Sequence, residues 1–491
     1  MNLSQLIALH GRYRADHPAI VERDRSFSYR ELDRYVTGNA LALMRLGVGR
    51  GDVVGVCLQD HAEFLACLLG VLRIGAIFLP MDWRWPQGEQ LRVAKAFDPK
   101  LVLAEPGRTM AAGIAVARVD EAWRQAAASE GATLAPAEGG EKTAILALSS
   151  GTTGQPKGYN LTHACYLAMC QNYWEVGVTQ GDRYLSVLPL AFASGRGMAM
   201  STLLAGATVI MFPTLAAADE IVAGAAQQQA TTLCLVPSLS RALLQLPAFS
   251  GQPLFPSIRL LVSIGAGLFP EEARAIRSQL TPHLVDLYGS SGGGLTTVLR
   301  SDEMERKAGS VGRPLIGVEV EVVDEQSQAL PPRITGRLRC RAPCMAAGFY
   351  RSEGGRDEAF LDGWYYPGDY AYLDEDGYVF LQGRTSEIII RGGINVFAPE
   401  VERAIASFEG ISEVAVLGYP VPDLGEEIAA FIVGRPGIAE RELVRHLRTE
   451  LAPYKIPRLF RFLEALPRNS AGKIVKAKLA ETLLGPEPPK T

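Results

Sequence analysis

Ten consecutive residues, 149–158, combine the side chains and the backbone freedom that phosphate binding requires. The run reads Ser-Ser-Gly-Thr-Thr-Gly-Gln-Pro-Lys-Gly and holds four hydroxyls, three glycines and one lysine. Such a loop presents many N–H and O–H donors beside one positive charge, and these groups can surround phosphate oxygens. Because Lys157 is followed by Gly158 rather than by Ser or Thr, the run differs from the common P-loop. A solvated linker is the alternative, but it does not explain a lysine next to a proline directly after a buried strand.

Four further stretches carry aromatic, acidic or basic residues among glycines. They are Asp286-Leu287-Tyr288-Gly289-Ser290-Ser291, Gly363-Trp364-Tyr365-Tyr366-Pro367-Gly368-Asp369, the pair Gly383-Arg384 followed by Arg391-Gly392-Gly393-Ile394-Asn395-Val396, and Pro467-Arg468-Asn469-Ser470-Ala471-Gly472-Lys473. With the run at 149–158 they resemble the motifs of the adenylate-forming superfamily, which includes acyl-CoA synthetases, aryl-CoA ligases, luciferases and peptide-synthetase adenylation domains. The motifs stand in the family's order, and the resemblance covers nearly the whole chain.

The resemblance implies an ATP-dependent acid–thiol ligase. In such enzymes a carboxylate attacks the α-phosphorus of ATP, and both partners are anions. Positive charge and fixed N–H donors are therefore needed where negative charge accumulates. The motif matches assign Lys473 to the carboxylate and the α-phosphate, and they assign Lys157 to the pyrophosphate end. Without its motif Lys473 would pass for a surface lysine, since Lys476 and Lys478 lie close by.

The same matches imply a nucleotide site. Asp369 offers two acceptor oxygens to the two ribose hydroxyls, although an aspartate that caps a turn is the alternative. Tyr288 matches the ring that packs on adenine, with a plain core aromatic as the alternative. Arg384 contacts the ribose or a phosphate, or else it forms a structural ion pair. The complete implied set is Ser150, Gly151, Thr152, Thr153, Gly154, Lys157, Gly265, Ala266, Asp286, Tyr288, Gly289, Ser290, Ser291, Asp369, Arg384 and Lys473.

Two positions depart from the family's pattern. Relatives usually have Thr and then Glu where this chain has Ser291 and Gly292, and that Glu helps to hold magnesium. Magnesium binds mainly through substrate phosphates and keeps several waters, so the change does not by itself abolish binding. The ligands stay open, with the Ser291 and Thr152 hydroxyls as candidates, and a weak or non-catalytic nucleotide-binding relative is the competing interpretation. Phe192 stands where relatives often have His, so an aromatic ring remains without a titrating group.

Resemblance places the acyl pocket at Phe192, Gly195, Ser238, Gly265, Gly292 and Gly293. The glycines at 292–294 remove side chains from one wall, which favours a fatty or aromatic monocarboxylate over an amino acid. Gly392 and Gly393 would let the pantetheine arm of coenzyme A pass close to the backbone, or they form a tight turn. We expect coenzyme A as the acceptor, ATP and Mg²⁺ as further requirements, and a separate acyl carrier protein as the alternative acceptor.

The elements that must position these residues follow an α/β pattern. Short apolar runs predict buried strands at residues 53–58, 101–104, 144–148, 207–212, 232–236, 260–264 and 284–287,. Helical spacing occupies residues 29–46, 62–74, 216–229 and 271–280. Alternation of the two indicates mostly parallel sheets flanked by helices. Gly and Pro thicken at 311–368, where short strands are expected, and residues 126–141 are expected to form an exposed connector.

After residues 383–386 the pattern changes to a compact α+β unit. We expect a helix that begins at Pro399 and ends at Gly410, strands at 414–419 and 428–433, and a helix at 440–451. The predicted domains are therefore a large one at 1–384, which binds ATP and the acid, and a small mobile one at 385–491, which carries Lys473.

Composition narrows the class of protein. The 491 residues are 48% hydrophobic and 21% charged, with a formal net charge of −4. This balance is typical of globular proteins and gives no electrostatic case for binding nucleic acid. The seven scattered cysteines indicate small buried thiols rather than a zinc site,. No targeting or membrane-spanning segment is evident, so we expect a cytoplasmic monomer or homodimer.

Overall fold

The computed structural model describes residues 1–129, 131–150, 156–214, 216–247, 252–351, 359–384, 387–391, 394–421, 425–469 and 474–483. The chain divides into two compact units. The first comprises Met1–Val320 with Cys340–Pro367, and the second comprises Glu321–Arg339 with Gly368–Thr491.

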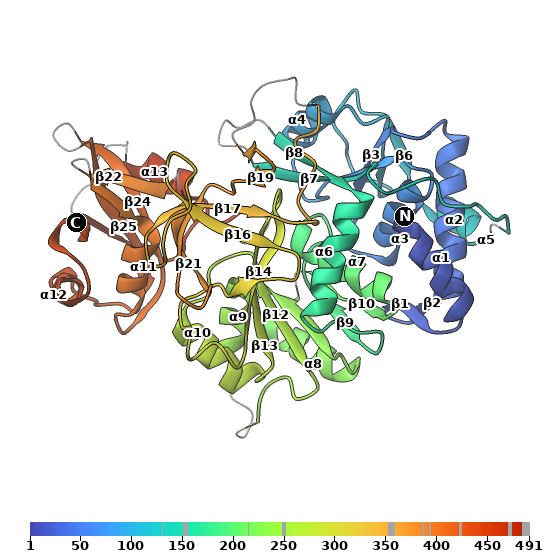
Figure 1. Cartoon of the computed structure of the whole chain (residues 1–491). Helices are drawn as coiled ribbons and strands as arrows, with labels where there is room; N and C mark the ends of the chain where they lie inside the picture. The colour runs from blue at the N-terminus through green and yellow to red at the C-terminus, as the bar shows by residue number, and fades with distance from the viewer. Residues whose placement is uncertain are drawn as a thin grey trace. The chain divides into compact units, whose positions relative to one another are not determined.

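Two sheets organise the first unit (Figure 1). The larger has nine strands in the order β15 (Arg313–Pro314), β14 (Gly294–Arg300), β13 (Leu284–Ser290), β12 (Leu260–Ile264), β11 (Thr232–Leu235), β9 (Arg183–Ser186), β10 (Thr208–Met211), β1 (Pro18–Glu22) and β2 (Arg25–Ser28). The smaller has β6 (Val116–Arg118), β5 (Leu101–Ala104), β3 (Val53–Cys57), β4 (Ile77–Pro80), β7 (Thr143–Ser150) and β8 (Pro156–Thr162). In the larger sheet the six neighbouring strands β13, β12, β11, β9, β10 and β1 are parallel. In the smaller sheet every pair is parallel except β7 with β8.

Three helices lie between these sheets. Helix α3 (Ala62–Arg73) contacts β3 and β4 of one sheet and β1 of the other, and α6 (His163–Glu175) contacts β7, β8 and β14. Helix α7 (Ala193–Ala205) packs against α6 and against β9, β10 and β11. All residues of α3 are buried, and all except Glu63 and Arg73 are apolar or small, as expected for a helix enclosed on every side.

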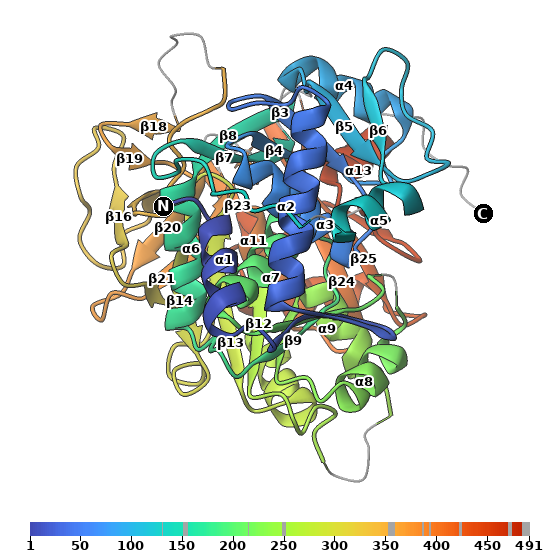
Figure 2. The ribbon, with the colours of Figure 1, turned by 90° about the vertical axis from the view of Figure 1, so that its right-hand side faces the viewer.

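Further helices cover the outer faces of the first unit. Helices α1 (Ser4–Tyr13) and α5 (Glu121–Ser129) pack against α2 (Tyr29–Arg45), which packs against α3 (Figure 2). The remaining helices are α4 (Gln87–Phe97), α8 (Ala218–Gln227), α9 (Pro237–Leu244) and α10 (Pro270–Ala275), and α10 continues into a π-helical turn, η1 (Ile276–Leu280).

Short strands form in and just after the segment 311–368, which is rich in Gly and Pro. They are β16 (Glu319–Val323), β17 (Gly336–Arg341), β18 (Phe360–Leu361), β19 (Trp364–Tyr365), β20 (Asp369–Leu373) and β21 (Val379–Arg384). Within the first unit, Cys340 of β17 pairs with Tyr365 of β19. Within the second, β17 pairs with β20, which pairs with β21.

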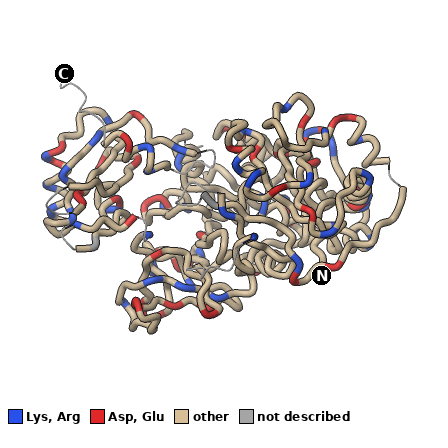
Figure 3. The backbone as a smooth tube through the Cα atoms, turned by 90° about the horizontal axis from the view of Figure 1, so that it is seen from above, with Lys and Arg blue, Asp and Glu red and all other residues tan. Residues whose placement is uncertain are grey.

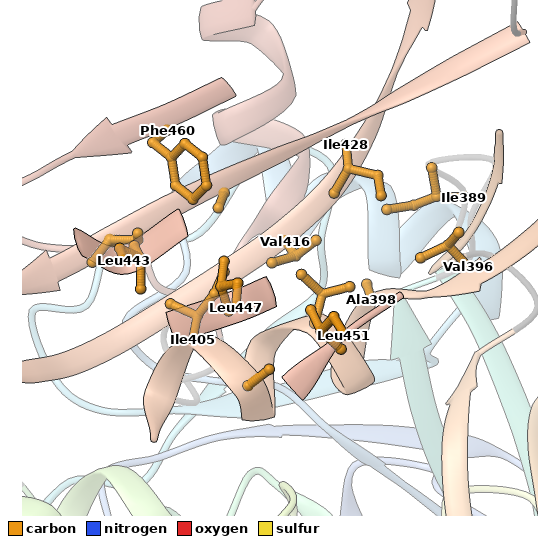
Figure 4. Close-up of a cluster of buried hydrophobic side chains, with 14 residues drawn as sticks. Ile389, Val396, Ala398, Ile405, Val416, Ile428, Leu443, Leu447, Leu451 and Phe460 are labelled. Carbon is orange, nitrogen blue, oxygen red and sulfur yellow. The ribbon is translucent and has the colours of Figure 1, made fainter. Parts of the chain in front are cut away.

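The second unit is an α+β arrangement with apolar residues on both faces of one sheet. Its strands are β22 (Ile388–Arg391), β23 (Ile394–Phe397), β24 (Ile411–Val421), β25 (Gly425–Gly434) and β26 (Leu459–Phe462), and its helices are α11 (Ala398–Ala406), α12 (Glu440–Glu450), the short 3-10 turn η3 (Pro453–Lys455) and α13 (Lys476–Leu483). Val416 and Ile428 face Ile405 of α11 and Leu447 of α12 (Figure 4). The alternate residues of the same strands pack with Leu479 of α13, because successive strand residues point to opposite faces.

The α/β class predicted from sequence is confirmed. Each predicted strand and helix has a counterpart in this structure, with ends that differ by a few residues. One difference falls in the expected connector at 126–141, where residues up to Ser129 belong to α5. All seven cysteines are free and buried. No helix in the described ranges is long and apolar enough to cross a membrane. Basic and acidic residues are interspersed along the chain (Figure 3).

Candidate functional site

Three neighbouring parallel strands end at one edge of the nine-stranded sheet. Strand β11 pairs with β12 up to Leu235 and Ser263, and β12 pairs with β13 up to Ile264 and Leu287. The segments that follow β11 and β12 contain the predicted residues Ser238, Gly265 and Ala266, and the last residues of β13 include Tyr288 and Gly289. Ligands of open α/β sheets bind outside the carboxyl ends of such strands. The register therefore gathers five of the sequence-predicted positions at an edge suited to a ligand.

The predicted serines and glycines form a tight turn at the end of β13. Ser290 of β13 pairs with Gly294 of β14, so residues 291–293 connect the two strands. The backbone N–H of Gly293 donates to Ser290 Oγ at 3.1 Å. A Cβ on Gly289 would lie 2.4 Å from the Gly294 carbonyl oxygen. Glycine is thus required there by the approach of the neighbouring strand.

Two tyrosine rings fill the space beside Gly292. A Cβ on this residue would lie 2.5 Å from Tyr365 Cε2 and 2.6 Å from Tyr159 Cε1. The hydroxyls of the two tyrosines are 3.2 Å apart. A glutamate at 292 therefore cannot enter unless these rings move. The same contacts remove the basis for a deep acyl pocket here, because protein atoms, not open space, adjoin the glycine.

The described residues of the first unit do not form a cluster of carboxylates that could hold magnesium. No group of three or more His, Cys, Asp or Glu residues able to hold a metal occurs among the described residues. Ser290 and Ser291 line a cavity, so the oxygen atoms that this turn can offer to a metal ion are those of hydroxyls. Such a set fits Mg²⁺ only where substrate phosphates and water supply most of the ligands.

The run at 149–158, which the sequence predicts to bind phosphate, includes the ends of two paired strands. Ser149 pairs with Lys157 and Ser150 with Pro156, which makes β7 and β8 a hairpin. Lys157 is exposed, and its Nζ lies 5.2 Å from the centre of the Phe349 ring. Gly151, Thr152, Thr153 and Gly154 lie outside the described residues, as does the side chain of Ser150. The described part of the hairpin places Lys157 at the base of this loop.

Phe192 and Gly195 mark the start of α7. The Phe192 ring faces the Arg84 guanidinium at 5.8 Å, and Arg84 Nη2 donates to Asp82 Oδ2 at 2.7 Å. A Cβ on Gly195 would come within 2.6 Å of the Leu188 carbonyl oxygen. Gly195 is therefore required for the close approach of α7 to the segment before it.

A small cavity of about 30 Å³ lies in the first unit. Its lining includes Arg196 and Tyr166 together with Ser290, Ser291 and Gly294. Sequence reasoning did not identify Arg196 or Tyr166. Arg196 carried a usable signal, since it is the one charged residue in the apolar sequence of α7, Ala-Ser-Gly-Arg-Gly-Met-Ala-Met-Ser-Thr-Leu-Leu-Ala.

The second unit brings together the two residues predicted to contact ribose. Asp369 at the start of β20 lies in register with Arg384 at the end of β21, and Arg384 Nε donates to Asp369 Oδ1 at 3.0 Å. The Asp369 side chain is buried, whereas that of Arg384 is more than half exposed. The ion pair holds the Asp369 carboxylate and leaves the arginine accessible.

The motif predicted to carry the catalytic lysine lies partly outside the described residues. Lys473, Gly392 and Gly393 lie outside the described residues. The nearby Lys476 Nζ lies 2.9 Å from Glu402 and 3.5 Å from Glu387. Burial alone would lower the pKa of Lys476, but the two carboxylates outweigh it and raise that pKa. Lys476 is therefore engaged structurally and is not available to a substrate.

Asp286 is a buried acid in the middle of β13. Burial raises its pKa to about 7, although the Ser263 hydroxyl on the adjacent strand acts in the opposite direction. Its Oδ1 has no hydrogen-bond donor among the described residues. Asp286 thus keeps its proton in the folded protein over much of the acidic range.

Comparison with known proteins matches both units. The model of the AMP-binding enzyme family matches residues 9–350, and the model of the AMP-binding enzyme C-terminal domain matches residues 400–473. The fatty acid–[acyl-carrier-protein] ligase ScoC of Streptomyces coeruleorubidus is 27% identical over 98% of this chain and 96% of its own. The sulfoacetate–CoA ligase of Cupriavidus necator is 30% identical over 97% of each chain. ATP-bound MatB from Rhodopseudomonas palustris is 29% identical with a TM-score of 0.91, over 98% of this chain and 99% of its own.

Asp286→Asn should change how stability depends on pH. The unfolded chain loses the Asp286 proton near pH ~4, whereas the folded protein holds it up to about pH 7. The stabilisation from this raised pKa is full below pH ~4 and is lost as the pH rises towards ~7. The free energy of unfolding of the wild type minus that of the variant should fall by roughly 2–4 kcal/mol across this window. Urea unfolding at a series of pH values measures it, and parallel curves would contradict the assignment.

Proposed function

Because the chain belongs to the AMP-binding enzyme family, we propose that it joins a carboxylic acid to ATP and then passes the acyl group to the thiol of coenzyme A. The first step forms an acyl-adenylate and releases pyrophosphate. The second forms a thioester and releases AMP. The observation that carries the proposal is the sheet edge at which β11, β12 and β13 end together. The turn that contains Ser290 and Ser291 follows β13 at this edge.

The division of labour follows from the charges of the reactants. A carboxylate and a triphosphate repel each other, so the site must supply positive charge and fixed donors. We assign Lys473 to the attacking carboxylate oxygen and to the oxygens of the α-phosphate, where the new bond to phosphorus forms, and Lys157 to the departing pyrophosphate. Bound Mg²⁺ would neutralise phosphate charge, and the Ser291 hydroxyl is the described side chain best suited to join its ligands.

Coenzyme A is the proposed acceptor and a carrier protein is the alternative. The resemblance to an acyl-CoA synthetase and the similarity to a sulfoacetate–CoA ligase support coenzyme A. The similarity to ScoC, a ligase that acts on an acyl carrier protein, supports the alternative. Both acceptors end in the same pantetheine thiol, so the first half-reaction does not distinguish them.

The residues beside Gly292 bear on which acid the protein binds. The sequence favoured a fatty or aromatic monocarboxylate because of the glycines at 292–294. In the described structure the space beside Gly292 is taken by Tyr159 and Tyr365, and the nearby cavity measures only about 30 Å³. These contacts favour a short acid over a long one.

Wild-type protein should release pyrophosphate from ATP only when an acid is present. A panel of short and long carboxylic acids with Mg²⁺ should reveal turnover, and added coenzyme A should convert it to thioester. Parallel reactions with a phosphopantetheinylated carrier protein separate the two acceptors. ATP binding without pyrophosphate release from any acid at saturating Mg²⁺ would refute the ligase assignment.

Lys473→Ala should slow adenylate formation by about 100-fold or more, because it removes the cation that offsets two meeting anions. Thioester formation from a supplied acyl-adenylate should be affected much less, since the small domain is expected to swing away for that step. Single-turnover measurements of each half-reaction test the difference. Lys478→Ala is the matched control, because Lys478 is an exposed lysine of the same segment. Equal losses in both half-reactions would argue against two conformations.

Asp369→Ala should weaken ATP and AMP binding without changing which acid is preferred. Two hydrogen bonds to a charged acceptor would be lost, which costs about 2–4 kcal/mol. Isothermal titration with AMP measures the effect. Asp374→Ala provides the control, because Asp374 is buried in the same hairpin and accepts from the backbone N–H groups of Asp376 and Tyr378. Similar AMP affinities for the two variants would place the ribose elsewhere.

A further inference from the structure

Arg196 is a buried cation without a carboxylate partner. It lies in α7, between the two sheets, and only 1% of its surface is exposed. Among the described residues, no Asp or Glu oxygen lies within ion-pair distance of its guanidinium. Burial lowers the pKa of Arg196, yet a guanidinium stays charged in proteins. A charge in this position is costly unless something compensates it.

Among the described residues of the first unit, Arg73 is the other fully buried arginine, and its charge has a partner. Arg73, also 1% exposed, donates to Asp33 Oδ1 at 2.6 Å and to Thr37 Oγ1 at 2.7 Å. Its charge is thus neutralised by a residue of this chain. The contrast shows that burial of an arginine in this fold does not exclude an ion pair, and that Arg196 lacks one.

The contacts of Arg196 use part of its donor capacity. Its Nη1 donates to the carbonyl oxygens of Leu190 at 3.1 Å and Ala191 at 2.8 Å, and the guanidinium faces the Phe78 ring at 5.7 Å. Among the described residues, neither its Nε nor the Tyr166 hydroxyl has a hydrogen-bond partner, although the two side chains are close enough to interact electrostatically. Arg196 and Tyr166 both line the cavity that also contains Ser290 and Ser291. Two unused donors therefore border the same small space.

We propose that Arg196 and Tyr166 bind a second anionic group, a carboxylate or a sulfonate, at the far end of a short acid substrate. The inference rests on the proposed ligase function and specifies its substrate class. An anionic oxygen in the cavity accepts from the guanidinium and from the Tyr166 hydroxyl, and it supplies the counter-charge that the chain itself does not provide. Because the cavity of about 30 Å³ has room for one small terminal group, the acid is short.

A purely structural role explains less. The two carbonyl oxygens that accept from Nη1 require only an N–H donor, and this donor need not be charged. A glutamine side chain could therefore replace the arginine in these two contacts. The Phe78 ring compensates a cation only weakly compared with a carboxylate. Neither contact accounts for the unused donors of Arg196 and Tyr166 at the cavity.

The test compares pairs of acids that differ only in the terminal group. Pyrophosphate release is measured for linear dicarboxylates, for ω-sulfo acids and for monocarboxylates of equal chain length, with wild type, Arg196→Met and Tyr166→Phe. Wild type should prefer the anionic-tailed acid by about 100-fold or more in kcat/KM, since a site built to bind a polar group strongly rejects the analogue that lacks it. Arg196→Met should lower this ratio by about 100-fold, and Arg196→Lys should restore part of it. The carboxylate and sulfonate arms show which anion is preferred.

Arg73→Met controls for the loss of a buried arginine. It should lower the thermal unfolding temperature without changing the ratio between the paired acids. A ratio near one in the wild type, or equal losses on both acids in Arg196→Met, would overturn the inference and leave the ligase function intact. Absence of pyrophosphate release from every acid would instead refute the ligase function itself. If Arg196→Met does not fold, Tyr166→Phe must still lower the ratio, because it removes one donor and retains the ring.

Discussion

The parallel register of β11, β12 and β13 fixes where a ligand can be held in the first unit. Because these strands end together, the residues after each of them meet at one sheet edge,. The turn at 291–293 continues from the last strand and brings the Ser290 and Ser291 hydroxyls to the cavity. Gly289 keeps this arrangement possible, since a side chain there would collide with the backbone of Gly294.

The helices between the two sheets impose a second constraint. They are surrounded by apolar residues, so the effective dielectric is low and each charge in this layer needs a partner. Arg73 at the end of α3 meets that need with Asp33. Arg196 in α7 does not, and it is the group that also borders the cavity. The layer is thus packed evenly, but the charge of Arg196 is not balanced by a carboxylate. This charge lies where the cavity leaves space for a ligand.

Sequence reasoning reached the fold more readily than the site. Buried strands such as β12 are mostly apolar runs, and the helix at 62–74 is apolar except for Glu63 and Arg73, so both were predictable from composition and length,. Motif resemblance located the loops beside these strands. What lies next to a loop residue depends on segments far apart in the chain, and this is where prediction from sequence ended. The rings beside Gly292 come from Tyr159 and Tyr365, and only the fold brings them there.

The same limit applies to the charges around the turn. Glycine at 292 first reads as the loss of a magnesium ligand, but the tyrosine rings show that the position is sterically closed to a carboxylate. Arg196 contributes a positive charge at the cavity, and residue 292 contributes no carboxylate. The charge near the cavity is therefore more positive than it would be with a glutamate at 292. An acid with a second negative charge meets stronger repulsion from ATP than a monoacid does, and a more positive wall reduces that repulsion. The departure at Gly292 and the unpaired Arg196 therefore act in the same electrostatic direction, towards a substrate that carries more than one negative charge.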